Sequence, residues 1–178
     1  MTEKAEASIE ERITSAALHL FNRRGYGAAT VGQIAREAGV GVGTLYRRWP
    51  DKPSLANEVY AQVLDRIESF QAPLVRGRSR KAKFIRLLRS FADFAKAEPQ
   101  MLLFLVGQPH EAYLDARNRE RQAAKDAVVL ELIAELRLTA SPEVAAAMSM
   151  GTIAQCVRTG AEFDPEDLAE RLWLALSS

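Results

Sequence analysis

The stretch GVGVGTLYRRWPDK, residues 39–52, places three glycines directly before an aromatic residue and two arginines. A glycine-rich run of this kind has two interpretations. It can be a loop that holds the phosphates of a nucleotide, or a tight turn that joins two helices and presents the second. The two interpretations predict different proteins, and the residues on either side of the stretch decide between them.

A helix, rather than a strand, is predicted before the glycines. Thr30 is a suitable N-terminal cap, and apolar residues follow it at helical spacing over residues 31–38. A dinucleotide-binding loop needs a buried strand before its glycines, and a Walker loop ends in Gly-Lys-Ser/Thr, whereas Gly43 is followed by Thr44 and then leucine. The stretch therefore predicts a helix-turn-helix whose second helix covers residues 42–49.

The turn also decides which side chains of the second helix face outward. Gly39 permits the sharp turn, Val40 fills the space between the helices, and Leu45 faces inward. The positions left facing outward are Val42, Gly43, Tyr46, Arg47 and Arg48. Arginine binds guanine or phosphate through paired N–H groups, and residues 23–52 carry six basic and two acidic residues. This local excess favours a nucleic acid partner, although a solvated basic turn without a partner is the alternative.

The rest of the chain is predicted to be helical throughout. Apolar residues recur every three or four positions over residues 9–24, 51–70, 81–97, 113–138, 142–159 and 165–176, and two prolines bracket a short apolar helix between residues 99 and 109. No segment shows the alternation typical of a strand. We therefore expect an all-α protein of about nine helices, with a helix-turn-helix domain over residues 1–52 and a second helical domain over residues 53–178.

Composition excludes several classes of protein. Apolar residues make up 48% of the chain and charged residues 26%, as in ordinary soluble domains. Cys156 is the only cysteine, so no intrachain disulfide forms, and the longest apolar run, residues 101–107, is too short to span a membrane. His19 and His110 have no metal-ligand spacing, and no motif frames a catalytic nucleophile. We expect a cytoplasmic protein with no metal, cofactor or enzymatic activity.

The N-terminal third also carries a group of short motifs in a fixed order. They lie in AALHLFNRRGYGAATVGQIAREAGVGVGTLYRRWPDKPSL, residues 16–55, and comprise an aromatic-to-glycine corner, a threonine before the second helix, AGV, GTLYRRW and the DK pair. Together they resemble the tetracycline-repressor (TetR) family of bacterial transcription regulators. The remaining residues resemble that family only in length and helical content.

The resemblance implies contacts with double-stranded DNA that contains an inverted repeat. The implied contacts are phosphates for Thr30, Thr44 and Lys52, the backbone or a thymine methyl group for Tyr46, and a division of base and phosphate contacts between Arg47 and Arg48. Gly41, Val42 and Gly43 stand where many family members have polar side chains. Because these three have almost no hydrogen-bonding capacity, we expect recognition to rely on methyl contacts and DNA shape.

The resemblance further implies a homodimer formed by the last two helices, and a small-molecule effector that releases DNA from the second domain. The apolar residues expected at the dimer interface are Met148, Ile153, Val157, Leu172 and Leu176. The residues expected around the effector are Phe84, Leu88, Phe91, Phe94, Met101, Phe104 and Leu105, with Gln108, His110 and Tyr113 as polar groups. A plain helical core is the alternative for each of them. With no acidic cluster nearby, we expect a hydrophobic, aromatic or weakly anionic ligand.

Two functions stay open at this point. One is a DNA-binding regulator, acting as a repressor that a small hydrophobic ligand releases. The other is an α-helical ligand- or partner-binding protein without specific DNA binding. The basic run at residues 76–89 is either the solvated face of a helix or a further contact with an anion, DNA included.

Overall fold

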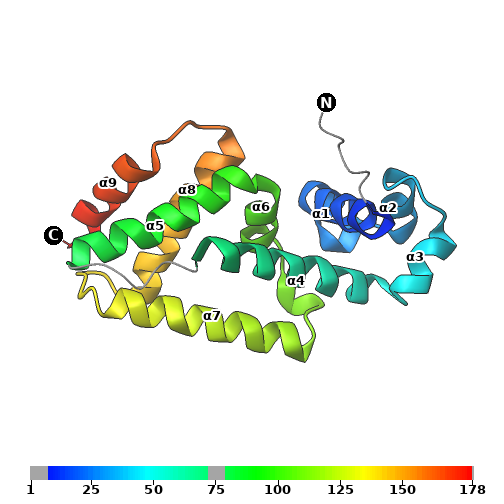
Figure 1. Ribbon diagram of the computed structural model, residues 1–178, viewed down its shortest axis with the longest axis horizontal. Coiled ribbons are helices and arrows are strands. Elements are labelled where there is room, and N and C mark those ends of the chain that lie inside the picture. The colour runs from blue at the N-terminus through cyan, green and yellow to red at the C-terminus, as the bar shows by residue number, and fades with distance from the viewer. Residues whose placement is uncertain (1–7, 72–78, 178) are drawn as a thin grey trace.

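The structure, a computed structural model, describes residues 8–71 and 79–177. Over these residues it contains nine α-helices, one short 3-10 helix and no strand, which confirms the all-α prediction (Figure 1). The elements are α1 (Ile9–Ala28), α2 (Val31–Glu37), α3 (Val42–Arg48), α4 (Lys52–Gln71), α5 (Arg80–Ala97), α6 (Pro99–Gly107), η1 (His110–Ala112), α7 (Ala116–Ala134), α8 (Pro142–Thr159) and α9 (Pro165–Ser177).

Helices α1 to α3 form one end of the molecule around a small apolar core. Two of them begin at capping boxes: Ser8 and Thr30 each accept a hydrogen bond from the backbone three residues later, and the side chain at that position bonds back. Phe21, Ile34 and Leu45 are fully buried between the three helices. The local signals in the sequence therefore agree with the packing of this domain.

Two glycines set the chain direction in this domain. Gly39 has φ +67°, as predicted for the end of α2, and Val40 N–H then donates to Ala35 O at 2.9 Å. Gly25 has φ +79° and interrupts α1 at the predicted helix end. The chain then makes a further helical turn to Ala28, so α1 extends beyond the helix predicted over residues 9–24.

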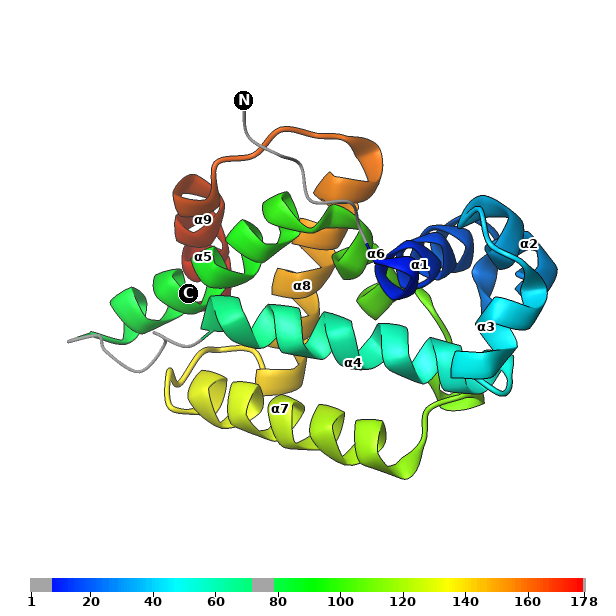
Figure 2. The ribbon, with the colours of Figure 1, turned by 45° about the vertical axis from the view of Figure 1, so that its right-hand side comes forward.

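Helix α4 joins the two ends of the molecule. Asp51 caps it by accepting from Ser54 N–H at 2.7 Å, and the hydrogen bonds from Ser54 lower the pKa of the Asp51 carboxyl. The buried side of α4 packs against α1, α5, α6 and α7. Figure 2 shows α4 running away from α3, with α7 alongside it.

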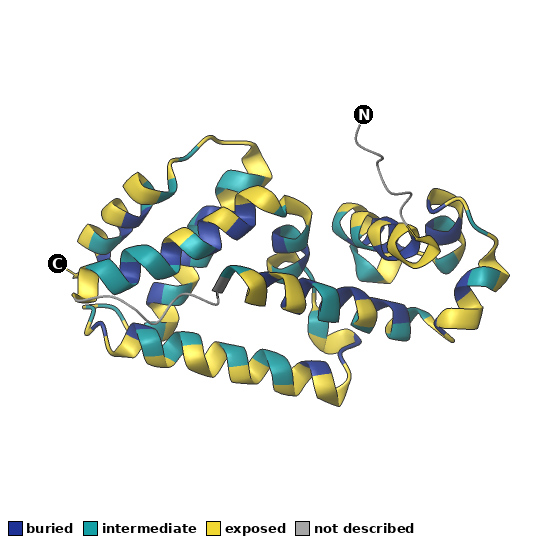
Figure 3. Ribbon diagram, in the orientation of Figure 1, coloured by how far each residue is buried: buried dark blue, intermediate teal, exposed yellow. Residues whose placement is uncertain are grey.

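The other end of the molecule is built on α5, which contacts α4, α6, α8 and α9. Helix α7 is shorter than the predicted helix over residues 113–138. Asp115 caps its start by accepting from Asn118 N–H at 2.8 Å, and Arg137 has φ +51°, which is incompatible with a continuing helix. Each helix buries one side and exposes the other (Figure 3). Within the described residues, no helix is both long and apolar enough for a membrane crossing.

Candidate DNA-binding surface and ligand cavity

Helix α3 exposes the side chains that the sequence predicted to face outward. Val42 and Tyr46 are 42% and 48% exposed, and Gly43, Arg47 and Arg48 are also exposed. Leu45 on the opposite side is fully buried, because residues three and four apart share a helix face and Leu45 packs on the α1–α2 core. Figure 1 places α3 at one extreme end of the molecule, where it is open to a large partner.

The two arginines of α3 have only exposed polar partners. Arg47 Nη2 donates to Thr44 Oγ1 at 3.2 Å, and Arg48 Nε lies 3.0 Å from Glu10 Oε1 on α1. Exposed ion pairs contribute ~0–1 kcal/mol, so a phosphate or a base readily replaces these partners. Thr30 uses its hydroxyl to accept from Gln33 N–H at 3.3 Å and stays at the surface.

A cavity of about 320 Å³ lies at the other end of the molecule, lined by residues of α4 to α8. Most of its lining is apolar, and the polar members come from α7 and α8. The lining residues are Leu64, Ile67, Phe84, Leu87, Leu88, Phe91, Leu105, Gln122, Lys125, Asp126, Val129, Leu130, Ile133, Glu143, Ala146, Ser149 and Met150. Phe84, Leu88, Phe91 and Leu105 are among the residues that the sequence placed at a ligand.

The other apolar residues expected around the ligand lie elsewhere. Phe94 and Phe104 are fully buried and do not line this cavity; Phe104 stacks against Phe21 with ring centres 6.1 Å apart. Met101 lies on a separate groove between α1, α4 and α6. The sequence pattern could not make this distinction, because helical spacing shows that a residue faces inward but not which neighbour it meets.

The three expected polar groups instead join α6 and η1 to α1. Gln108 Nε2 donates to Phe21 O at 2.9 Å, and its Oε1 accepts from Tyr26 N–H at 3.1 Å. His110 donates from Nε2 to Leu105 O at 2.9 Å and accepts at Nδ1 from the Tyr113 hydroxyl. Burial lowers the pKa of His110, so the neutral ring is favoured, and burial raises the pKa of Tyr113. None of the three reaches the cavity.

The expected dimer residues divide between two sides of α8 and α9. Ile153, Leu172 and Leu176 are buried within this chain, so they are not available to a partner. This corrects the prediction: α9 packs on α5, and α8 packs on α5, α6 and α7, so the chain itself covers these residues. Val157 is half-buried, while Met148 is 43% exposed. The other large apolar residues exposed on these helices are Val144 and Leu174.

Comparisons with known proteins agree with this arrangement. Residues 13–59, from α1 into α4, match the family model for bacterial regulatory proteins of the tetR family. The fold is shared with the solved structure of AibR in complex with isovaleryl coenzyme A and operator DNA, over 96% of this chain and 98% of that one, with a TM-score of 0.74 and 15% identity. The likeness to the TetR family in sequence therefore lies in residues 13–59.

Two regulators show the likeness in sequence. The repressor KstR of Rhodococcus jostii (strain RHA1) is 36% identical over 69 residues, which are 39% of this chain and 32% of KstR. The regulator HbdR of Aromatoleum sp. (strain CIB) is 43% identical over 63 residues, which are 34% of this chain and 28% of HbdR. The matched segment spans about a third of these relatives, so the likeness in sequence is confined to one part of the chain.

Lys52, within the segment that matches the tetR family model, occupies a structural position. Its Nζ donates to the carbonyl oxygens of Tyr26 at 2.8 Å, Ala29 at 3.1 Å and Gly27 at 3.3 Å. An ammonium group has three donors, so all are used, and none is left for the phosphate that the resemblance implied. Lys52 thus ties the start of α4 to the end of α1.

The described part of the basic run at residues 76–89 is distant from α3. Arg76 and Arg78 lie outside the described residues. Lys81 and Lys83 pair with Glu170 and Glu135 at 3.2 and 3.1 Å, and Figure 1 places the start of α5 at the opposite end of the molecule from α3. The described residues Arg80, Lys81, Lys83 and Arg89 of the run therefore contact other groups within the chain.

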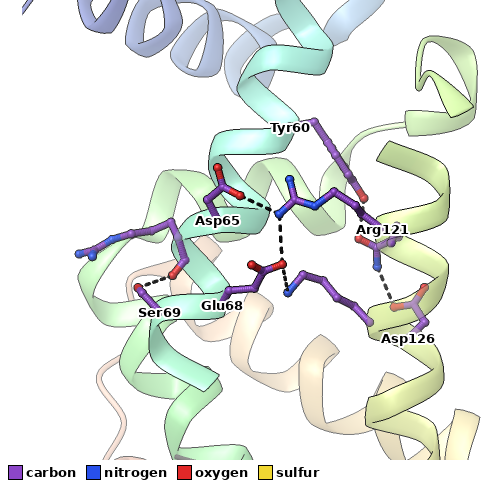
Figure 4. Close-up of polar contacts among 9 residues, drawn as sticks. Tyr60, Asp65, Glu68, Ser69, Arg121 and Asp126 are labelled. Carbon is purple, nitrogen blue, oxygen red and sulfur yellow. Dashed lines mark hydrogen bonds and ion pairs between the residues drawn. The ribbon is translucent and has the colours of Figure 1, made fainter. Parts of the chain in front are cut away.

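Sequence reasoning missed a polar cluster between α4 and α7, drawn in Figure 4. Arg121 Nη2 donates to Asp65 Oδ1 at 2.7 Å and to Glu68 Oε1 at 3.1 Å, and Lys125 Nζ lies 3.0 Å from the same Glu68 oxygen. The hydrogen bond from Lys125, followed by that from Arg121, lowers the pKa of Glu68. The first half of α7 is strongly polar, but the sequence does not show which helix its charges face.

A chain of two hydrogen bonds runs beside the ion pairs. Tyr60 O–H donates to Gln122 Oε1 at 2.7 Å, and Gln122 Nε2 donates to Asp126 Oδ1 at 2.7 Å. Burial raises the pKa of Tyr60 to about 12, so its hydroxyl stays protonated and remains a donor. Because Gln122, Lys125 and Asp126 also line the cavity, one wall of the cavity is held directly on α4.

Proposed function

We propose that the protein is a DNA-binding transcriptional regulator that acts as a homodimer on an inverted repeat and responds to a small molecule in its cavity. One observation carries the proposal. Within the domain that matches the tetR family, α3 turns Val42, Tyr46, Arg47 and Arg48 to solvent, although none of them contributes to the core. Two arginines and an aromatic side chain on one exposed helix face suit the major groove of DNA.

The domains divide these tasks in the proposal. Residues 1–52 bind DNA, with Arg47 as the base-reading residue and Arg48, Thr30 and Thr44 on phosphates. Residues 53–178 hold the effector and form the dimer. Lys52, at the boundary, joins the two parts and does not contact DNA.

The exposed side of α8 and α9 supports the dimer part of the proposal. Val144, Met148 and Leu174 lie on it, and small residues such as Gly151 beside Met148 allow close approach of another helix. A second copy of the same face covers these residues with two-fold symmetry, and two copies bring two α3 helices to the two halves of an inverted repeat.

The apolar cavity supports the effector part of the proposal. It falls at the lower end of the ~300–1,000 Å³ typical of small-molecule sites, and its walls include two phenylalanines, Phe84 and Phe91. Members of the tetR family are regulatory proteins rather than enzymes. We propose no catalytic role for this chain, and no described feature favours ligand binding without DNA binding.

Selection of bound duplexes from a random DNA library tests the proposal. We expect enrichment of an inverted repeat, with affinity that falls steeply as the salt concentration rises. The exposed variant Arg47→Ala should select a repeat that is less defined at one position in each half. Recovery of unenriched DNA by the folded protein at low and high salt would contradict the proposal.

A further inference from the structure

Ser149 on α8 has a buried hydroxyl with no hydrogen-bond partner within the described part of the chain. The residue is 6% exposed and lines the cavity. Thr152 and Thr159 on the same helix donate their hydroxyls to the carbonyls four residues earlier, at 2.6 and 2.9 Å. Ser149 makes no such bond. A buried polar group without a hydrogen-bond partner is costly and rare in folded proteins. We therefore ask which molecule in the cavity could supply a partner for this hydroxyl.

The other polar groups that line the cavity from α7 already have partners. Lys125 is held by Glu68, and Gln122 uses its oxygen for Tyr60 and its nitrogen for Asp126. Among the lining groups, Ser149 Oγ is therefore the buried atom with unused hydrogen-bonding capacity. A molecule bound in the cavity contacts mainly apolar side chains and one hydroxyl that has no other partner.

The charges at the cavity disfavour an anion. Lys125 is the one cation in the lining, and the Glu68 carboxylate 3.0 Å away neutralises it. Asp126 and Glu143 also line the cavity, and neither forms an ion pair within the described residues. The weakly anionic ligand expected from the sequence would thus meet two carboxylates and no free cation.

We propose that the effector is a neutral, mainly aliphatic molecule with one oxygen that hydrogen-bonds to Ser149. This inference rests on the proposed function of the cavity as the effector site. The volume of about 320 Å³ accommodates a short chain, and the free hydroxyl selects one with a carbonyl or hydroxyl oxygen. Ser149 is then the residue that determines specificity.

Four probes of similar size test the ligand class: dibutyl ketone, nonane, nonanoate and dibutylammonium. Trp173 reports binding through its fluorescence, because its ring lies 5.6 Å from that of the lining residue Phe84. The measurement uses the DNA-free full chain, so it remains informative if DNA binding fails. The variant Trp173→Phe should lose the signal. We expect dibutyl ketone to bind at least tenfold more tightly than nonanoate or dibutylammonium.

Ser149→Ala tests the anchor, with Ser90→Ala as the matched control. Ser90 donates to Leu87 O at 3.0 Å and does not line the cavity. We expect Ser149→Ala to weaken dibutyl ketone about five- to tenfold, the effect of one neutral hydrogen bond, and to leave nonane unchanged. Without ligand, Ser149→Ala should be at least as stable as the parent chain, because it removes an unpaired buried hydroxyl.

Three outcomes would overturn the proposal. One is tighter binding of nonanoate or dibutylammonium than of dibutyl ketone, which would assign a charged effector. The second is an equal loss for dibutyl ketone and nonane in Ser149→Ala, which would make Ser149 a packing residue. The third is no binding of dibutyl ketone to the parent chain. A ligand that binds as expected but leaves DNA affinity unchanged would contradict only the proposed function.

Discussion

Replacing Lys52 by methionine tests the connection between α1 and α4. Lys52 Nζ donates to three carbonyl oxygens at the end of α1 and lies 4.4 Å from the centre of the Tyr26 ring. Methionine keeps the apolar stem at nearly the same length but has no N–H group. Lys52→Met therefore removes the hydrogen bonds and the cation–π contact while largely preserving the packed volume.

The expected loss follows from the burial of the three acceptors. A hydrogen bond from a charged donor contributes ~1.5–3 kcal/mol, and an exposed cation–π contact ~0.5–1 kcal/mol. The bond to Gly27 is exposed and those to Tyr26 and Ala29 are only part-buried, so water replaces much of what is lost. We expect the free energy of unfolding to fall by ~2–3 kcal/mol, and Tm by roughly 4–12 °C for a chain of this size.

Urea unfolding at one fixed protein concentration measures this loss, since a dimer's stability depends on concentration. Lys81→Met is the matched control: Lys81 pairs with Glu170 at 3.2 Å, both side chains are about half exposed, and we expect a loss below ~1 kcal/mol. The prediction is contradicted if Lys52→Met leaves the free energy of unfolding unchanged but weakens binding to all DNA sequences alike and makes the salt dependence shallower. Lys52 would then be a phosphate contact.

The remaining predictions concern DNA, the dimer and pH. Arg47→Ala should cost ~1–3 kcal/mol at one base position per half-site, measured with operators varied position by position; an equal loss on all sequences would assign Arg47 to phosphate instead. Met148→Glu should give a folded monomer in sedimentation equilibrium, whereas Ile153→Glu should unfold the chain because Ile153 is fully buried. If the Met148→Glu variant is still a dimer, α8 is not part of the interface. Burial lowers the pKa of His110 in the folded chain below its unfolded value of ~6.5. The unfolded chain therefore binds more protons below that pH, and the free energy of unfolding decreases as the pH is lowered. Urea unfolding at about pH 7 and about pH 5.5 should show a smaller fall for His110→Gln, and an identical fall would indicate another group.

The DNA-binding end was predictable because its signals are local. Gly39 at positive φ, the threonine cap at Thr30 and the inward Leu45 each follow from a few neighbouring residues. Once the turn is fixed, the helical period alone decides that Tyr46 and Arg47 face outward.

The cavity and the dimer face were only partly predictable, because they depend on contacts between distant segments. Periodicity marked Ile153 and Leu172 as apolar-face residues, but only the packing of α8 on α5, α6 and α7 and of α9 on α5 shows that this chain covers them itself. The same limit applies to Phe104, which fills the core beside Phe21. Ser149 has no signal in the sequence at all, since its importance lies in a bond that it does not make.

The glycines that flank Val42 leave room for the chain to change what it recognises. A side chain built on Gly41 or Gly43 meets no other atom within 4 Å, and Gly41 has φ −71°, which any residue adopts. Within a helix, replacing glycine by alanine is favourable by ~0.5–1 kcal/mol, which applies to Gly43. Gly41 is the N-cap of α3, where Ser, Thr, Asn or Asp is the favoured replacement. The start of α3 therefore does not contribute side chains to the packing of the domain. New operator preferences can arise there by single substitutions, while the buried half of the same helix continues to hold the domain together.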